Sequence, residues 1–249
     1  GKLFYFYKGR LSFDGGFKKD PFIHHPTKSI YIHPCVFNNN NILNDDIHNS
    51  SNISDCSIME NNEMEQKVLS MPRIGDNTPD FEAVTTKGKI KFSDFAKDKW
   101  VVMFSHPADF TPVCTTEMSG FAKRKSEFDA LNTELLGLSI DSIHAHVGWV
   151  QNVRENTGVY FDFPIIADLD MKVSKLYGML QPNESETAAV RAVFFIDPNK
   201  KIRLIMYYPL NVGRNMDEIL RALEALQTSD EYKVAMPLDW KKGDKVIVS

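Results

Sequence analysis

The stretch from Trp100 to Glu117 constrains the fold of this chain more than any other part. Its beginning, Trp100–Ser105, is a short apolar run that predicts a buried strand. His106-Pro107 ends this strand, because proline has no N–H group to give to a sheet. Pro112 then precedes a helical pattern, and the first turn of a helix tolerates proline well. We therefore expect Cys114 in the first turn of a helix that follows a buried strand.

The position predicted for Cys114 suits a reactive thiolate. The first turn of a helix has backbone N–H groups without partners and the positive end of the helix dipole, and both stabilise an anion. The thiolate is the reactive form of cysteine. The alternative is a buried cysteine that serves as an inert part of the core.

The composition excludes several classes of protein. The 249 residues are 43% hydrophobic and 25% charged, with a formal net charge of −4, so we expect neither nucleic acid nor a membrane as a partner. No apolar run approaches the roughly 20 residues that span a bilayer. The three cysteines, Cys35, Cys56 and Cys114, are too few for a secreted disulfide scaffold.

Residues 1–70 differ from the rest of the chain. Residues 1–34 are aromatic and basic, and residues 37–66 are rich in Asn, Asp, Ser and Glu. Such a composition buries little apolar surface, so we predict a low-complexity, disordered or loosely ordered N-terminal extension. The basic part is typical of a targeting segment, although a tail without any address explains it equally well. We expect a cytoplasmic protein, with an organelle or the nucleus as the alternative.

The remaining sequence predicts alternating strands and helices. The predicted strands are Phe81–Val84, Lys89–Phe92, Trp100–Ser105, Glu134–Ile140, Pro164–Asp168, Val190–Ile196 and Ile202–Tyr208. The predicted helices start at Ser93 and span Cys114–Leu131, Ile143–Asn156, Val173–Tyr177 and Asn215–Thr228. This order indicates an α/β fold with helices layered on a sheet.

The motif around the cysteine carries a family resemblance. Pro107-x-x-x-Thr111-x-x-Cys114 resembles the peroxidatic motif of the peroxiredoxins, and the full string Ser105–Glu117 resembles the peroxiredoxin-6 (1-Cys) subgroup. The resemblance implies a thioredoxin-like fold, a central mixed β-sheet flanked by helices with a C-terminal extension. We therefore predict a peroxidase domain at residues 71–228 and a C-terminal dimerisation tail at residues 229–249.

The resemblance also implies an activity, that of a thiol-dependent peroxidase in antioxidant defence and redox homeostasis. Such an enzyme reduces hydrogen peroxide and small organic hydroperoxides through a cysteine sulfenic acid. Peroxide attack needs a thiolate and donors for the developing charge. Cys114 is the expected nucleophile. Arg191 matches the family's site arginine and stands in an apolar strand, where an unpaired charge is costly; the alternative places it in solvent.

Five further residues have expected roles at this site. In the family motif, Thr111 bridges the thiolate and the peroxide, and Pro107 shields the sulfur from water. Glu117 can hold an arginine through a charge-assisted bond, or merely reflect the preference of helix starts for acidic residues. His106 and Arg214 match residues of the peroxiredoxin-6 subgroup, with structural and surface roles as their respective alternatives.

No metal or bound cofactor is expected. His144-x-His146 has no cysteine or carboxylate set that completes a metal site. The string Ser139–Trp149 resembles a family segment with a helix histidine and tryptophan, and this resemblance favours a structural role for His146 and Trp149. No cysteine follows Cys114, so an external thiol reductant such as thioredoxin or glutathione is expected to reduce the sulfenic acid. Cys35 or Cys56, or a cysteine beyond Ser249, are the alternative routes.

Two other functions stay open at this stage. One is a thioredoxin-like thiol–disulfide oxidoreductase, although its usual C-x-x-C is missing because Cys114 is followed by Thr115-Thr116-Glu117. The other is a non-enzymatic holdase or scaffold oligomer. For the peroxidase and for both rivals we expect a homodimer or higher oligomer, because the apolar strand Ile202–Tyr208 would be an aggregation risk as a free edge. The tail around Trp240, too short to bury itself, is predicted to pack on the neighbouring subunit.

Overall fold

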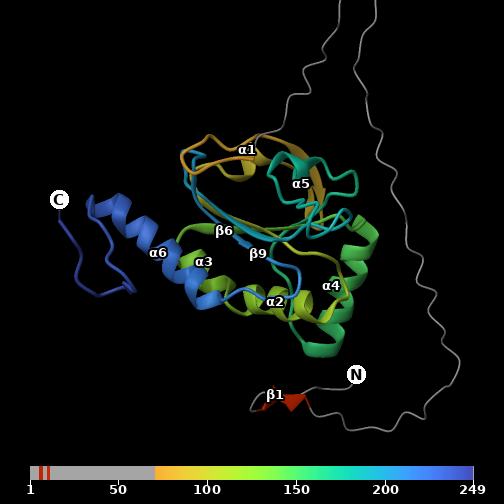
Figure 1. Cartoon of the computed structure of the whole chain (residues 1–249). Coiled ribbons are helices and arrows are strands. Elements are labelled where there is room, and N and C mark those ends of the chain that lie inside the picture. Colours follow the sequence, from red (N-terminus) through yellow and green to blue (C-terminus); the bar gives the residue numbers. More distant parts are fainter. Residues whose placement is uncertain (1–5, 8–9, 12–70, 249) are drawn as a thin grey trace, which may run out of the picture. The chain divides into compact units, whose positions relative to one another are not determined.

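The computed structural model describes residues 6–7, 10–11 and 71–248 (Figure 1). The chain divides into two units, residues 1–61 and 62–249. In the first unit, the strands β1 (Phe6–Tyr7) and β2 (Arg10–Leu11) pair antiparallel. Most of the predicted N-terminal extension, with Cys35 and Cys56, lies outside the described residues, so its predicted disorder and address stay predictions.

Within residues 71–248, one mixed sheet contains seven strands in the order β4-β3-β7-β6-β5-β8-β9. The strands are β3 (Glu82–Thr85), β4 (Gly88–Lys91), β5 (Trp100–Ser105), β6 (Thr133–Ser139), β7 (Ile165–Ala167), β8 (Arg191–Ile196) and β9 (Ile202–Tyr208). β5 runs parallel to β6 and antiparallel to β8. β9 is an edge of the sheet, so the strand predicted to need a covering partner does lie at an edge.

Helices cover both faces of this sheet (Figure 1). One face carries α1 (Phe92–Phe95) and α5 (Lys172–Leu176), and the other carries α2 (Pro112–Lys123), α3 (Lys125–Ala130), α4 (Ile143–Thr157) and α6 (Met216–Tyr232). β5 is buried on both faces because its side chains alternate between two cores. Val102 and Phe104 pack with α2, α4 and α6, whereas Val101 and Met103 pack with α1 and α5. The predicted α/β layering is therefore confirmed.

Most predicted helix boundaries agree with the structure to within two residues, and two helices differ by more. The helix expected at Cys114–Leu131 is interrupted at Arg124, whose backbone (φ −106°, ψ 11°) leaves the helical region between α2 and α3. Phe121 and Phe128 stay on the core side across this break, so the apolar spacing could not reveal it. The last helix ends at Tyr232 and not at Thr228. The prediction missed its final turn because that turn is polar and has no apolar periodicity.

The C-terminal segment lies beside α6, in dark blue in Figure 1. Trp240 is only 3% exposed, its carbonyl accepts a hydrogen bond from Arg221, and its indole N–H donates to the carbonyl of Asp244 at 3.3 Å. Trp240 is thus buried against α6 of its own chain, and the packing of the tail on a neighbouring subunit stays a prediction. Leu238 remains 91% exposed.

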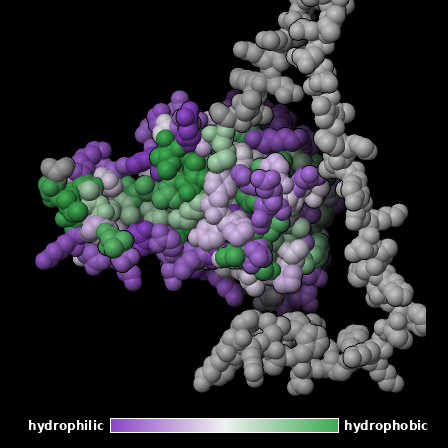
Figure 2. All heavy atoms as spheres, in the orientation of Figure 1, coloured by the Kyte–Doolittle hydropathy of each residue, from purple (hydrophilic) through white to green (hydrophobic). Residues whose placement is uncertain are grey.

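Apolar side chains also gather on the surface. Figure 2 shows hydrophobic residues over the region of β9 and α6, on the face where the C-terminal segment runs. Six of the seven residues of β9 are partly exposed. No helix among the described residues is both long and apolar enough to cross a bilayer.

Candidate active site

The loop between β5 and α2 leads directly to the cysteine. β5 ends at Ser105, and α2 begins at Pro112, so Cys114 is the third residue of the helix. Thr111 is the N-cap residue in an extended conformation (φ −89°, ψ 149°). The side chain of Cys114 is buried. The predicted position of Cys114 is therefore confirmed: its sulfur belongs to the helical turn whose N–H groups lack helical partners.

Arg191 reaches the sulfur from the neighbouring strand. β8 runs antiparallel to β5, with Val193 opposite Phe104, and this pairing brings the start of β8 next to the end of β5. Arg191 Nη1 lies 3.4 Å from Cys114 Sγ. Its Nε and Nη2 donate to the carbonyl of Leu210 at 2.9 and 2.6 Å. The guanidinium is 3% exposed and fixed from two sides, so the solvent-facing alternative is wrong.

Glu117 joins two arginines one helical turn after Cys114. Its Oε2 accepts from Arg191 Nη1 at 2.6 Å, and its two oxygens accept from the Nε and Nη2 of Arg214, each at 2.9 Å. Burial alone would raise the pKa of Glu117, but the charges and hydrogen bonds of Arg214 and Arg191 hold it below its ordinary value. Glu117 is therefore a buried carboxylate that orients both guanidinium groups.

The side chain of Arg214 is buried more deeply than that of Arg191, with exposed fractions of 0% and 3%. Its Nη1 donates to the carbonyls of Ser105 and Ala192, each at 2.9 Å, and its guanidinium lies over the rings of Phe104 and Phe121. Burial lowers the pKa of Arg214, and Glu117 opposes that effect. The surface alternative for Arg214 is therefore wrong. Its contacts lie with Glu117 and the ends of the strands.

The other two predicted loop residues frame the site without a hydrogen bond to sulfur. Thr111 donates its hydroxyl proton to the carbonyl of Ala108 at 2.9 Å, which leaves the lone pairs of the hydroxyl oxygen as acceptors. A bridge in which Thr111 donates to the thiolate is thus not made in this structure. Pro107 is half-buried in the loop. The roles expected of Thr111 and Pro107 stay predictions.

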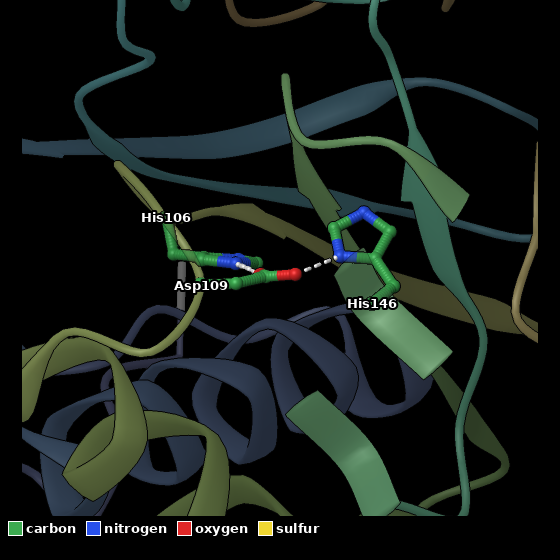
Figure 3. Close-up of side chains that lie close together, drawn as sticks. All are labelled: His106, Asp109 and His146. Atoms are coloured by element: carbon green, nitrogen blue, oxygen red, sulfur yellow. Dashed lines mark hydrogen bonds and ion pairs between the residues drawn. The ribbon is translucent and has the colours of Figure 1, made fainter. Parts of the chain in front are cut away.

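His106 is buried and belongs to a network that the sequence did not reveal (Figure 3). Its Nε2 lies 2.7 Å from Asp109 Oδ1, and Asp109 Oδ2 lies 2.7 Å from His146 Nδ1. Asp109 is thus the carboxylate that the sequence analysis did not find for His146, and His144 is exposed and takes no part. Only the fold brings Asp109 and His146 together, because they are 37 residues apart.

Two sequence families match this chain. The model of the AhpC/TSA family matches residues 74–205, and that of the C-terminal domain of 1-Cys peroxiredoxin matches residues 225–249. The chain is similar to a peroxiredoxin of Methanosarcina mazei, with 54% identity over 184 residues that cover 72% of this chain and 84% of that protein. It is 53% identical to a peroxiredoxin of Aquifex aeolicus, over 70% of this chain and 78% of that protein.

Solved structures agree with this assignment. Yeast mitochondrial 1-Cys peroxiredoxin, studied for the resolution of its thiol via glutathione/thioredoxin systems, has 49% identity and a TM-score of 0.68, and the match covers 72% of this chain and 87% of that one. A mutant of peroxiredoxin 6 of Arenicola marina has 40% identity and a TM-score of 0.67, over 71% and 83% of the two chains. The mixed sheet, the cysteine at the start of α2 and these matches show that the chain belongs to the peroxiredoxins, thiol-dependent peroxidases with a thioredoxin-like fold.

Proposed function

We propose that Cys114 reduces hydrogen peroxide and small organic hydroperoxides by direct attack on oxygen. The thiolate forms an S–O bond with the hydroxyl oxygen of the peroxide, and the O–O bond breaks. The other oxygen leaves with the electron pair as hydroxide or alkoxide and takes up a proton, and Cys114 becomes a sulfenic acid. The observation that supports this most directly is the Arg191 guanidinium, fixed 3.4 Å from a buried sulfur at the start of a helix.

Arg191 is the expected donor for the charge that moves onto the peroxide. Its Nη1 already faces the sulfur, so a peroxide that reaches Sγ comes within range of the same guanidinium. Glu117 and Leu210 fix this group before the reaction, and preorganised donors stabilise developing charge without reorganisation. Arg214 binds both carboxylate oxygens of Glu117, which in turn binds Arg191, so we expect Arg214 to act through Glu117.

The second half of the cycle uses an external thiol. Cys114 is the free cysteine of the described residues, and no cysteine follows it in the sequence. We expect a thiol of the glutathione or thioredoxin type to attack the sulfenic acid, release water and form a mixed disulfide, which a second thiol then reduces. The yeast 1-Cys relative, studied with these two systems, supports this choice of reductant.

The residues around Cys114 favour peroxide over a protein disulfide as the oxidant. An oxidoreductase of the thioredoxin type uses the second cysteine of a C-x-x-C motif to release the mixed disulfide that it forms. Cys114 is followed by Thr115, Thr116 and Glu117, so this second thiol is missing from the motif. The site arginine that supports peroxide attack is present instead.

We also propose a homodimer that covers the edge of β9. Antiparallel pairing of two β9 strands around a two-fold axis would satisfy their open backbone groups with the same surface on both subunits. The hydrophobic surface over β9 and α6 in Figure 2 supports this interface. The exposed Leu238 of the C-terminal segment adds apolar surface to the same region.

Loss of turnover in Cys114→Ser tests the peroxidase proposal. Peroxide consumption is measured with glutathione or thioredoxin as the reductant, and the sulfenic acid is trapped and located by mass spectrometry. Cys114→Ser should lose turnover, while the combined change of Cys35 and Cys56 to serine should keep the oxidation step at the rate of the parent. Turnover retained by Cys114→Ser would contradict the mechanism.

A further inference from the structure

We infer that Asp109 and His146 are positioning residues for peroxide reduction, and that they act as a buried carboxylate–imidazolium pair. The pair joins α4 to the loop of residues 106–111 (the active-site loop), which carries Pro107 and Thr111. This inference rests on the proposed function of Cys114. It adds two residues that touch neither the sulfur nor the peroxide but hold the loop that leads from β5 to Cys114.

Hydrogen-bond partners determine where the protons of this network lie. His146 Nε2 lies 3.0 Å from the carbonyl oxygen of Ile166, which can only accept, so this nitrogen carries a hydrogen. His146 Nδ1 faces a carboxylate oxygen of Asp109 at 2.7 Å. Burial alone would raise the pKa of Asp109, but hydrogen bonds from His106 and His146 hold it below its ordinary value. Both nitrogens of His146 thus face oxygen acceptors, a carbonyl and a carboxylate, so we assign a hydrogen to each of them, which makes the ring an imidazolium.

His106 is the neutral member of the network. Burial lowers the pKa of His106, against the opposing effect of Asp109. Its Nε2 donates to Asp109 Oδ1, so Nδ1 of a neutral ring carries no hydrogen. Nδ1 has no hydrogen-bond partner among the described residues, which agrees with a bare nitrogen, since an unpaired buried N–H is the rarer case. The carboxylate and the imidazolium then balance each other's charge.

The network fastens the active-site loop at its start and at its middle. At the start, the backbone N–H of His106 donates to the carbonyl of Leu138 in β6. Further along, the backbone N–H of Asp109 donates to Asp141 Oδ2 at 3.0 Å, and the Asp109 side chain binds both histidines. Asp109 is therefore the point at which the loop is held to α4 and to Asp141, in the turn that follows β6.

A second set of contacts continues from His106 to the neighbour of Cys114. The ring centroids of His106 and Trp149 are 5.1 Å apart. The indole N–H of Trp149 donates to Thr115 Oγ1 at 3.3 Å, and the Thr115 hydroxyl donates to the carbonyl of Thr111 at 2.8 Å. A loop that lost Asp109 would therefore lose its bond to α4, and the contacts through Trp149 and Thr115 would carry this change to the first turn of α2.

The same three side chains could instead hold a metal ion, since their ligand atoms lie within 4.8 Å of one another. The distances favour protons. Each histidine nitrogen lies 2.7 Å from a different oxygen of Asp109, which is the length of a charge-assisted hydrogen bond. The hydrogen bonds of the two histidines already account for the lowered pKa of Asp109, and His146 Nε2 already has the carbonyl of Ile166 as its partner. Neither residue needs an ion to satisfy it.

Two substitutions of His146 separate the role at the loop from a role in packing. His146→Asn keeps an amide donor where Nδ1 faces Asp109 and loses the contact with Ile166. His146→Gln keeps a donor where Nε2 faces Ile166 and loses the contact with Asp109. Stopped-flow measurement gives the rate constant for oxidation of Cys114 by hydrogen peroxide, and alkylation by iodoacetamide reports the intrinsic reactivity of the same thiol.

We expect the peroxide rate constant of His146→Gln to fall at least tenfold, since misplacement by about 1 Å can cost about a hundredfold. Its alkylation rate should stay within about threefold of the parent, and His146→Asn should stay within about threefold in both assays. His144→Gln, an exposed neighbour on α4, is the matched control and should change neither rate. The reverse order of the Asn and Gln variants, or equal peroxide rates in both, would overturn the inference.

Nitrogen-15 spectra test the proton assignment even if a His146 variant does not fold. Both ring nitrogens of His146 should show the shifts of protonated nitrogen in the parent, and Asp109→Asn should convert one of them to a bare nitrogen. An unchanged spectrum, or one equivalent of bound metal in the purified parent, would overturn the pair. A parent that consumes no peroxide would instead refute the proposed function, whereas an active parent matched by His146→Gln refutes this inference alone.

Discussion

Replacing Glu117 by glutamine should destabilise the protein strongly, although the two side chains have nearly the same size. Four hydrogen bonds converge on this carboxylate: one from Arg191 Nη1 at 2.6 Å, and three from the backbone N–H, Nε and Nη2 of Arg214 at 2.8, 2.9 and 2.9 Å. A glutamine can accept with one oxygen only. Its NH₂ group would face a guanidinium N–H, donor against donor, and both arginines would lose their counter-charge.

The magnitude follows from the burial of the three groups. The side chains of Glu117, Arg191 and Arg214 are 5%, 3% and 0% exposed. Breaking a buried ion pair by removing one partner costs about 3–5 kcal/mol, because the remaining charge stays buried. The matched control is Glu127→Gln, which removes a carboxylate that is 50% exposed and pairs with Arg124 at the surface. An exposed pair contributes about 0–1 kcal/mol, so the control should stay close to the parent.

Urea unfolding at one fixed protein concentration measures both variants. The pH dependence gives a second check with a definite sign. The pKa of Glu117 is lowered in the folded protein from an ordinary value of 4.5, so its stabilisation is complete above that value and is lost as the pH falls through the folded pKa. The difference between parent and Glu117→Gln should therefore shrink below about pH 4.5. If Glu117→Gln lowered the free energy of unfolding by less than about 1 kcal/mol at pH 7, that result would refute the reasoning. A difference between parent and variant that did not change as the pH is lowered would also refute it.

The remaining predictions concern Arg191 and the N-terminal extension. Arg191→Lys should slow the oxidation of Cys114 by peroxide by about a hundredfold, because one ammonium cannot bind Leu210 and reach the sulfur together; the loss of a single preorganised donor costs about 10²–10³. Equal stopped-flow rates for Arg191→Lys and the parent would exclude Arg191 as the site donor. Removal of residues 1–70 should leave the mass of a dimer in light scattering, and a monomeric mass at micromolar concentration would argue against the β9 interface.

The sequence alone determined the local elements of this protein and the position of its proposed nucleophile. Apolar periods of two and 3.6 residues placed the strands and helices, since these signals depend only on neighbours along the chain. Prolines at positions 107 and 112 placed Cys114 at a helix start, and that position is confirmed. An arginine in an otherwise apolar strand marked Arg191, because a buried charge needs a partner. The sequence was therefore sufficient for those features that depend on residues close to one another along the chain.

The tertiary structure decided how these elements meet. The order of the sheet sets Arg191 beside Cys114 across 77 residues, and no local period encodes which strands become neighbours. The surface of α6 that buries Trp240 was likewise not visible in the tail's own residues. The pairing of Asp109 with His146 had no local signal, since the two residues are 37 positions apart. Such contacts depend on strand order and on helix placement over the sheet, which the packing of both cores sets together.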